Sequence, residues 1–464
     1  MNGGDPVPRA AMMNLEEAAR VLAGELAGAP VEFFGVTTDS RAIDAGDLFI
    51  AIRGERFDGN DYVAEAIARG AAGALTSRRV AGDLPIPQVI VGDTRLALGR
   101  LAAHWRRRFA QLPLVALTGS NGKTTVKEML AAILARHAGA AEAVLATKGN
   151  LNNDIGMPVT LLGLRERHRF AVIEMGMNHA GEIDYLTRIA APQVAIVNNA
   201  QRAHVGLLGS VEAIAHAKGE IYSGLGADGV AVINADDGFA AYWVSLNLSR
   251  RIVSFGFAAA ATVRGEIVGE RVRVTTPRET FEMRLRVAGE HNVRNALAAC
   301  AGAYALGVDS ATIAAALGEF SGVPGRLQRR PAVGGATLID DTYNANPESM
   351  KAAIAVLAAE RGRRVFVMGD MGELGEQADA MHAEVGRFAR EKGIERLLAL
   401  GPASRHAAAA FGAGAAHFTD MDELRVAAAH EAAASATILV KGSRFMQMER
   451  LADFLAADGS PDAV

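Results

Sequence analysis

Short apolar runs alternate along the chain with segments whose apolar residues recur at helical spacing. The run LPLVALTG precedes the periodic segment TTVKEMLAAILARHA, and FAVIEMG precedes EIDYLTRIA. The same order recurs in VAIVNNA before VEAIAHAKGEIYSGL, in ATLIDDTYNANP before ESMKAAIAVLAAE, and in ATILVKGSR before MQMERLADFLA. Strands that alternate with helices are typical of parallel sheets joined by crossover helices. The pattern therefore predicts an α/β protein, in which ligands bind at the carboxyl ends of the strands.

Breaks in this pattern predict three domains. The segment HWRRRFAQLP lies just before the first strong strand and marks one boundary, and we interpret its arginine triplet as a solvated helix end. A second boundary lies in SGVPGR, which is rich in turn residues. Between the two, residues 251–287 contain the alternating runs RIVSFGF, RVRVTT and FEMRLRV, which predict an antiparallel flap. The expected domains span residues 1–112, 113–322 and 323–464.

Composition excludes several classes of protein. The 464 residues are 50% hydrophobic and 22% charged, which suffices for several cores and argues against disorder. A net charge of −4 argues against a nucleic-acid-binding surface, which would carry a basic stripe. The single cysteine, Cys300, excludes an intrachain disulfide, fits a reducing compartment and is expected to be a buried apolar side chain. Because no apolar run reaches about 18 residues and no signal peptide is evident, we expect a cytoplasmic monomer without a membrane span.

The stretch VALTGSNGKTTVKEML, residues 115–130, predicts a phosphate-binding loop between a strand and a helix. Its end fits the pattern G-x-x-x-x-G-K-[ST], but Leu117 occupies the first glycine position and the glycine stands at Gly119 instead. Backbone N–H groups and the helix dipole favour an anion there, with Lys123 on the terminal phosphates and the Thr124 hydroxyl on Mg²⁺. An ordinary strand–turn–helix with an exposed lysine is the weaker interpretation. The expected ATP site comprises Gly119, Ser120, Asn121, Gly122, Lys123, Thr124 and Thr125.

Three further polar residues follow predicted strands or face the same edge of the sheet. Glu174 ends the strand FAVIEMG, where a carboxylate is either a surface group or a ligand for Mg²⁺, which takes one or two carboxylates plus phosphate oxygens. His204 lies in a loop after another strand, and Lys218 lies on the helix that follows. Taken alone, His204 is expected to be a hydrogen-bonded polar residue and Lys218 a solvated one.

Polar residues also gather near the second boundary. Asn292 and Asn295 are three residues apart at a helix start and share a face, where their amides can read an adenine edge or hold phosphate-proximal groups. Helix capping would explain one of them but not both. Arg326 follows the inter-domain turn, from which a guanidinium can reach a phosphate across a cleft. The strand end LIDDTYNANP clusters Asp340, Asp341, Asn344 and Asn346.

These motifs, in this order, resemble those of the Mur ligases, the ATP-dependent amide-forming enzymes of peptidoglycan precursor synthesis. TGSNGKTT is similar to that family's variant phosphate loop, and DSRAIDAGDLFIAIRGERFDG resembles its N-terminal UDP-substrate domain. GNLNNDIGMP, AKGEIYSGL, DDTYNANPESM, MGDMGELG and VKGSRFMQME are most similar to the members that add D-alanyl-D-alanine. The resemblance covers essentially the whole chain. It implies a small α/β N-terminal domain, a central P-loop-type ATPase domain with a parallel sheet, and a Rossmann-like C-terminal domain that closes over the nucleotide.

The resemblance also implies a set of metal and phosphate ligands. Lys123 and Thr124 hold the ATP phosphates and Mg²⁺, and Glu174 and His204 ligate Mg²⁺. Lys218 corresponds to the lysine that CO₂ carbamylates in this family, and its carbamate helps to place a second Mg²⁺ ion. The resemblance implies five catalytic residues, which are Lys123, Glu174, His204, Lys218 and the linker arginine Arg326.

Nucleotide and substrate contacts are implied in the same way. Asn292 and Asn295 match the family's nucleotide-side asparagines, Arg326 its linker arginine, and Asp341 its aspartate near the ribose, with Asp340 as the alternative for that role. The candidates for substrate contacts are Ser40, Arg41, Asn150, Asn152, Asn153, Asn344 and Asn346.

The implied reaction is the joining of D-alanyl-D-alanine to UDP-N-acetylmuramoyl-tripeptide. The terminal carboxylate of the tripeptide attacks the γ-phosphate of ATP, and the dipeptide amine then attacks the acyl phosphate. Two relatives with the same core are alternatives. They are the diamino-acid-adding Mur ligase, whose arginine-bearing motif is not found here, and folylpolyglutamate synthetase, which lacks a domain like residues 37–59. A P-loop regulatory or transport ATPase is a third possibility, but it leaves the first 112 residues without a role.

Overall fold

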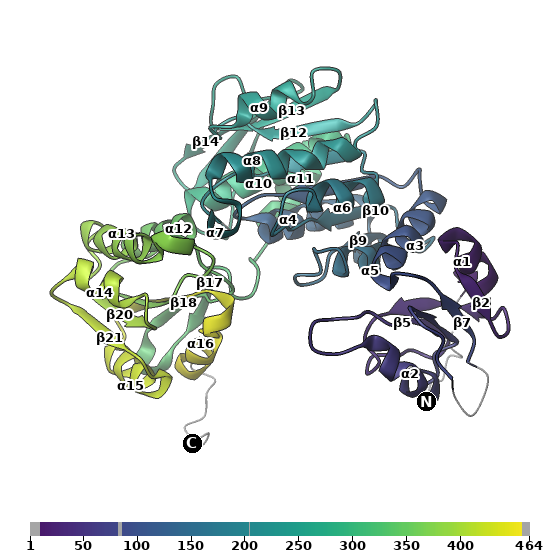
Figure 1. Cartoon of the computed structure of the whole chain (residues 1–464). Coiled ribbons are helices and arrows are strands. Elements are labelled where there is room, and N and C mark those ends of the chain that lie inside the picture. Colours follow the sequence, from purple (N-terminus) through teal and green to yellow (C-terminus); the bar gives the residue numbers. More distant parts are fainter. Residues whose placement is uncertain (1–9, 82–85, 204, 457–464) are drawn as a thin grey trace, which may run out of the picture.

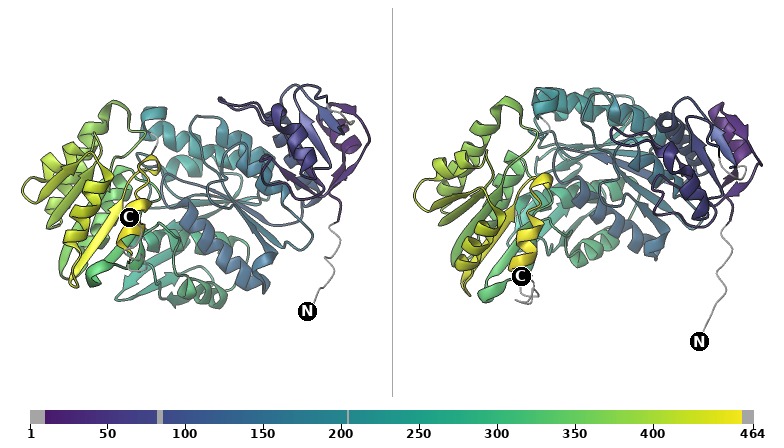
Figure 2. Two further views of the ribbon diagram at one scale, coloured as in Figure 1. Left: turned by 90° about the horizontal axis from the view of Figure 1, so that it is seen from below. Right: turned by 60° about the horizontal axis from the view of Figure 1, so that its bottom comes forward.

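The computed structural model describes residues 10–81, 86–203 and 205–456 and arranges them in three α/β units (Figure 1). The units follow one another along the chain, the central one lies between the other two, and each contains its own sheet (Figures 1 and 2). The predicted α/β architecture is therefore confirmed. No helix within those residue ranges is long and apolar enough to span a bilayer.

The N-terminal unit is built on a five-stranded sheet of order β2-β7-β6-β5-β4, in which β2 is antiparallel to β7 and the other pairs are parallel. A separate two-stranded ribbon pairs β1 with β3. Asn14 caps the first helix, because its side chain accepts a hydrogen bond from the N–H of Glu17. The elements are β1 (Met13–Asn14), α1 (Leu15–Leu22), β2 (Glu25–Ala27), β3 (Glu32–Phe33), β4 (Gly35–Thr37), β5 (Asp47–Ile50), η1 (Gly59–Tyr62), α2 (Val63–Ala68), β6 (Gly73–Thr76) and β7 (Gln88–Ile90).

The central unit is built on a nine-stranded sheet of order β16-β15-β14-β13-β12-β11-β8-β10-β9. Its strands are β8 (Leu114–Thr118), β9 (Val144–Ala146), β10 (Phe170–Glu174), β11 (Val194–Val197), β12 (Val230–Asn234), β13 (Arg251–Gly256), β14 (Val263–Val268), β15 (Arg271–Thr275) and β16 (Thr280–Met283). Its helices are α3 (Thr94–Arg108), α4 (Lys123–Ala138), η2 (Ala141–Ala143), α5 (Gly156–Leu162), α6 (Glu182–Ala190), α7 (Val205–Leu208), α8 (Val211–Gly219), η3 (Glu220–Gly224), α9 (Ala240–Ser245), α10 (Glu290–Ala305) and α11 (Ser310–Glu319).

Helices cover both faces of this central sheet. Leu114 and Ala116 of β8 lie in the core shared with α3, α5, α6 and α8, whereas Val115 and Leu117 lie in the core shared with α4, α10 and α11. This alternation follows from the two-residue period of a strand. Cys300 on α10 is buried in the second core, as predicted, and burial raises the pKa of its thiol to about 12.

The predicted antiparallel flap is partly wrong. Strand β13, the run RIVSFG, pairs parallel with β12 and places Val253 and Phe255 in the core, so it belongs to the main sheet. Strand β14 (Val263–Val268) was not anticipated, because its sequence VRGEIV carries a charged residue on each side of its glycine and its far end is exposed. Within residues 251–287, β14 pairs antiparallel with β15, and β15 with β16. Strands β13 and β15 both alternate at period 2, and periodicity does not reveal the direction of a neighbour.

Helix α3 connects the first two units, since it packs on α1 and also on α5 and α6 (Figure 1). The boundary near residue 112 assigns it to the N-terminal domain and stays a prediction. The expectation of a solvated arginine triplet at its end is wrong for Arg106, which is buried and donates to the carbonyls of Ala190 (2.9 Å) and Leu112 (3.2 Å). Burial lowers the pKa of Arg106 to about 10. Its neighbour Arg107 is exposed, because successive helical residues point about 100° apart.

The C-terminal unit is a six-stranded sheet of order β17-β18-β22-β19-β20-β21, in which β17 is antiparallel to β18 and the other pairs are parallel. Helices α12, α13 and α14 cover one face, and α15 and α16 cover the other. The elements are β17 (Gln328–Pro331), η4 (Val333–Gly335), β18 (Thr337–Asp341), α12 (Pro347–Ala358), β19 (Arg363–Gly369), η5 (Gly375–Gln377), α13 (Ala378–Glu391), β20 (Arg396–Leu400), α14 (Arg405–Phe411), β21 (Ala415–Phe418), α15 (Met421–Glu431), β22 (Ala436–Lys441), η6 (Arg444–Met446) and α16 (Glu449–Leu455).

Candidate active site

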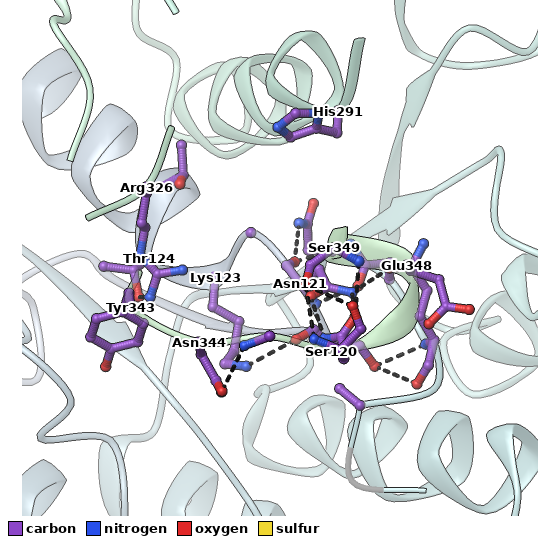
Figure 3. Close-up of a pocket in the computed structure, with 18 of the residues that line it drawn as sticks. Ser120, Asn121, Lys123, Thr124, His291, Arg326, Tyr343, Asn344, Glu348 and Ser349 are labelled. Carbon is purple, nitrogen blue, oxygen red and sulfur yellow. Dashed lines mark hydrogen bonds between the residues drawn. The ribbon is translucent and has the colours of Figure 1, made fainter. Parts of the chain in front are cut away.

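A cavity of about 1010 Å³ lies where the carboxyl edge of the central sheet meets the C-terminal unit (Figure 3). Strands β8, β10 and β11 are neighbours and end at this edge, because Glu174 pairs with Leu117 and Val197 with Thr118. On the other side, β18 and β22 also end together, with Asp341 opposite Lys441. Parallel strands therefore deliver polar side chains from two sheets to one space.

The phosphate loop lines this cavity, and close contacts explain why two of its positions are glycine. Gly122 has φ of 77° at the start of α4, and a Cβ there would lie 2.2 Å from Asn295 Oδ1. A Cβ at Gly119 would lie 2.9 Å from the Cβ of Asn198. Leu117, which occupies the usual first glycine position, is a buried strand residue. The shorter loop therefore needs its first glycine two residues later than the common pattern.

Lys123 folds back over this loop. Its ammonium donates to the carbonyl of Gly119 at 2.7 Å, and burial lowers its pKa, an effect that Arg326 reinforces and Glu174 opposes. An anionic phosphate at the loop would offset the electrostatic cost of burying this cation. The expectation that Lys123 is an exposed lysine on an ordinary turn is therefore not favoured.

Thr124, Glu174 and Arg326 form one hydrogen-bonded group at the helix start. Figure 3 shows Arg326 beside Thr124. The Thr124 hydroxyl donates to Glu174 Oε2 at 2.9 Å and accepts from Arg326 Nη2 at 2.9 Å, while Asn152 donates to Glu174 Oε1 at 2.7 Å. Arg326 Nε is buried and has no hydrogen-bond partner among the described residues. One carboxylate, one hydroxyl and added phosphate oxygens suit Mg²⁺, and an unpaired guanidinium N–H suits a phosphate.

Lys218 is not solvated, contrary to the expectation for the residue taken alone. It lies in the last turn of α8 and is 2% exposed. Burial lowers its pKa well below the usual value, and Lys123 lowers it further. Both effects shift the equilibrium of Lys218 toward its neutral amine. His204 lies outside the described residues, so its predicted role as a metal ligand stays a prediction.

The two asparagines of α10 line the cavity and do not cap the helix. Gly289 occupies the N-cap position, whereas Asn292 donates to the carbonyl of Ala288. Asn295 donates to Asn292 Oδ1 at 3.2 Å and accepts from Asn198 at 3.1 Å. The capping alternative is therefore wrong, and both amides remain candidates for nucleotide contacts.

The side chains of the two adjacent aspartates point to different partners. Asp341 lines the cavity and bonds to Lys441, whereas Asp340 points to Thr342 and Arg330. If one of them approaches a nucleotide, the geometry favours Asp341. The other predicted substrate residues that line the cavity are Asn150, Asn152, Asn153, Asn344 and Asn346.

Ser40 and Arg41 are not brought to this cavity. They follow β4 in the N-terminal unit, where the Arg41 side chain is 81% exposed and pairs with Asp39. The guanidinium of Arg41 lowers the pKa of the Asp39 carboxyl to about 2. Their predicted contact to a distal part of the substrate stays a prediction.

Models of one protein family match most of this chain. The Mur ligase middle domain matches residues 117–303, the Mur ligase glutamate ligase domain matches 325–444, and the catalytic domain of the Mur ligase family matches 32–106. UDP-N-acetylmuramoyl-tripeptide–D-alanyl-D-alanine ligase of Escherichia coli is 42% identical, with 97% of this chain and 99% of the relative covered. The chain belongs to the Mur ligase family.

Two solved Mur ligases share the whole arrangement. The crystal structure of MurF from Acinetobacter baumannii has a TM-score of 0.89 and 40% identity, with 97% of this chain and 99% of that chain covered. The crystal structure of MurF ligase from Thermotoga maritima in complex with ADP has a TM-score of 0.79 and 26% identity, with coverages of 90% and 96%. The family predicted from the motifs is thus confirmed.

Several residues at the Mur ligase cavity were not singled out from the sequence. They include Lys441 in the run VKGSR and Asn198 in the run VAIVNNA. Lys441 ends β22 and Asn198 directly follows β11, and a polar residue at the end of a buried strand is the sequence signal that could have selected them. Tyr343 of the cavity lining and Arg202 beside it gave no such signal, because their partners Arg326 and Glu384 are brought to them only by the fold.

Two contacts fasten the C-terminal unit to the loops beside the phosphate site. Asn346, the N-cap of α12, donates to Asn121 Oδ1 at 2.7 Å. Arg202 donates through both terminal nitrogens to Glu384 on α13, each at 2.9 Å, and through Nε to Glu348 at 2.6 Å. We call these contacts the docking contacts.

Glu384→Gln is expected to weaken docking by about 1 kcal/mol and to raise KM for ATP about fivefold, because a half-buried bidentate pair loses its charge. Arg202 lowers the pKa of Glu384 to about 2 from a usual value of 4.5. The docking contribution is therefore full above pH 4.5 and is lost as pH falls towards 2. Small-angle scattering of the ATP-analogue complex measures docking, and exposed Glu391→Gln on the same helix is the control. An unchanged radius of gyration and KM would contradict the docking role.

Proposed function

We propose that this Mur ligase forms the amide bond between UDP-N-acetylmuramoyl-tripeptide and D-alanyl-D-alanine, with ATP as the energy source. The observation that carries the proposal is the meeting of Lys123 and Glu174 from the central unit with Arg326 from the linker at one cavity. The substrates are those named for the Escherichia coli relative at 42% identity, which favours the dipeptide over a diamino acid as acceptor. The ADP complex of the Thermotoga maritima relative supports ATP use.

The reaction proceeds by activation of the tripeptide carboxylate. One carboxylate oxygen bonds to the γ-phosphorus of ATP as ADP leaves, giving an acyl phosphate. The dipeptide amine then attacks the acyl carbon, loses a proton, and phosphate leaves. Lys123 and Arg326 stabilise charge on the transferred phosphoryl group, and Asn292 and Asn295 orient the nucleotide. The docked C-terminal unit keeps water from the acyl phosphate.

We further propose that two Mg²⁺ ions are bound here. Thr124, Glu174, His204 and a carbamylated Lys218 would hold them, and bound Mg²⁺ neutralises the phosphate charge. The donor set supports this, since Glu174 and Thr124 share a hydrogen bond beside the loop. Burial lowers the pKa of Lys218, which shifts it toward the neutral amine that reacts with CO₂. A carbamate anion near Lys123 would also balance its charge.

The remaining assignments are proposals on the same basis. The UDP-substrate domain spans 1–112, with Ser40 and Arg41 on the uridine side, the ATP domain spans 113–322, and the closing domain spans 323–464. The enzyme acts as a monomer in the cytoplasm, where ATP and nucleotide-linked precursors are found.

The test is phosphate release from ATP in the presence of UDP-N-acetylmuramoyl-tripeptide, with and without D-alanyl-D-alanine. We expect release to rise strongly on addition of the dipeptide and the amide product to appear by mass spectrometry. A parallel reaction with the dipeptide precursor and a diamino acid tests the alternative acceptor. Absence of any stimulation by D-alanyl-D-alanine would sink the assignment.

A further inference from the structure

Arg326 reaches the phosphate loop from a linker that is fastened to the C-terminal unit. Leu327 packs against the C-terminal core, and β17 begins at the next residue. The N–H of Tyr343 donates to the carbonyl of Gly325 at 3.1 Å, and the guanidinium carbon of Arg326 lies 4.1 Å from the centroid of the Tyr343 ring. Arg326 is therefore attached to the C-terminal unit, although its side chain contacts Thr124 of the central one (Figure 3).

The backbone next to Arg326 is held in an uncommon conformation. Leu327 has a φ of 52°, which lies in a left-handed region that residues other than Gly, Asn and Asp rarely adopt. Its N–H donates to Asp341 Oδ1 at 3.2 Å, from the end of β18. Such a conformation persists when the surroundings over-determine it. Asp341 thus fixes the peptide unit that aims the Arg326 side chain.

Lys441 in turn holds Asp341. Its ammonium lies 2.6 Å from the other oxygen of Asp341, Oδ2, and donates to the carbonyl of Asn344 at 2.7 Å. The two residues are register partners on β18 and β22, and the Lys441 side chain is 3% exposed. Burial raises the pKa of Asp341, and Lys441 opposes that rise. Both carboxylate oxygens are therefore engaged by the protein itself.

We propose that Lys441 and Asp341 are positioning residues that aim Arg326 at the phosphate of ATP. The chain of contacts runs from Lys441 to Asp341 to the N–H of Leu327, and Arg326 then reaches Thr124 Oγ1. Through these contacts, the position of the Arg326 guanidinium depends on the strand ends of the C-terminal sheet. The inference rests on the proposed use of ATP, but not on the identity of the acceptor.

A double-mutant cycle on ATP-analogue affinity tests this relay. By calorimetry, we expect Arg326→Ala and Lys441→Met each to weaken binding of a non-hydrolysable ATP analogue with Mg²⁺ by about tenfold, and the double variant to be no more than about twofold weaker than Arg326→Ala. Additive losses of about 100-fold would mean that Lys441 acts on the ligand by itself and would overturn the proposal. Unchanged affinity in Lys441→Met would overturn it as well.

Conservative variants separate positioning from a general loss of structure. Asp341→Asn keeps an oxygen acceptor for the N–H of Leu327, so it should retain more affinity than Asp341→Ala. Equal losses in the two would contradict the relay. Exposed Lys392→Met in the same unit is the control for loss of a lysine, and thermal unfolding checks each fold. Since analogue binding needs no acceptor, a wild-type enzyme that ignores D-alanyl-D-alanine refutes the proposed function while the cycle still decides the relay.

Discussion

Replacing Lys218 with alanine is expected to lower dipeptide-dependent phosphate release by roughly 10³-fold, which corresponds to about 4 kcal/mol of transition-state stabilisation. The reason is the environment of the amine, which is buried near Lys123 and has a pKa well below the usual value. A neutral amine takes up CO₂, and the resulting carbamate supplies an anionic oxygen ligand for Mg²⁺ that alanine lacks. Wild-type activity should also fall in CO₂-depleted buffer and return when bicarbonate is added.

Chemical rescue distinguishes a carbamate from other uses of Lys218. Lys218→Ala leaves a space that acetate or formate can enter, so part of the activity should return when these anions are added. Lys218→Met fills that space, so it serves as the matched control and should show no rescue. Full activity in Lys218→Ala would contradict any role at the site. Lost activity that neither anion restores in either variant would contradict the carbamate specifically.

Replacing Lys123 with methionine is expected to lower kcat by roughly 10²- to 10³-fold, because one preorganised donor to the transferred phosphoryl group is lost. Methionine retains much of the side-chain volume, and α4 should keep its fold because Gly122 and the helix start remain. The affinity for ATP should fall less than kcat, since the cation is needed most where charge develops in the transition state. Rapid-quench measurement of acyl-phosphate formation separates this step from product release.

Lys123→Arg provides the conservative comparison for this prediction. The ammonium of Lys123 lies 2.7 Å from the carbonyl oxygen of Gly119. The larger, planar guanidinium of arginine does not fit the same position. We therefore expect arginine to restore only a small part of the activity despite its charge. Activity within a few-fold of wild type in Lys123→Met would show that the lysine does not contact the transferred group.

The sequence by itself determined the α/β class, the phosphate loop and the family. These features are local, since a strand, a glycine-rich turn and a helix start are adjacent in the chain, and their pattern reflects local geometry. The same locality explains the errors. The arginines of α3 and the strand β13 gave patterns that fit two environments, and only packing put Arg106 inside the protein and β13 into the parallel sheet.

Tertiary structure alone decided which polar residues meet. Asp340 and Asp341 are adjacent and chemically identical, yet the register of β18 against β22 places only Asp341 beside Lys441. Asp340 lies on the other face of the strand and pairs with Arg330. Lys218, expected to be solvated when taken alone, is buried because α8 packs its side chain into the interior, where Lys123 affects its pKa. Arg202 finds Glu384 across 182 positions of sequence. Burial and pairing depend on contacts distant in sequence, and no local pattern encodes them.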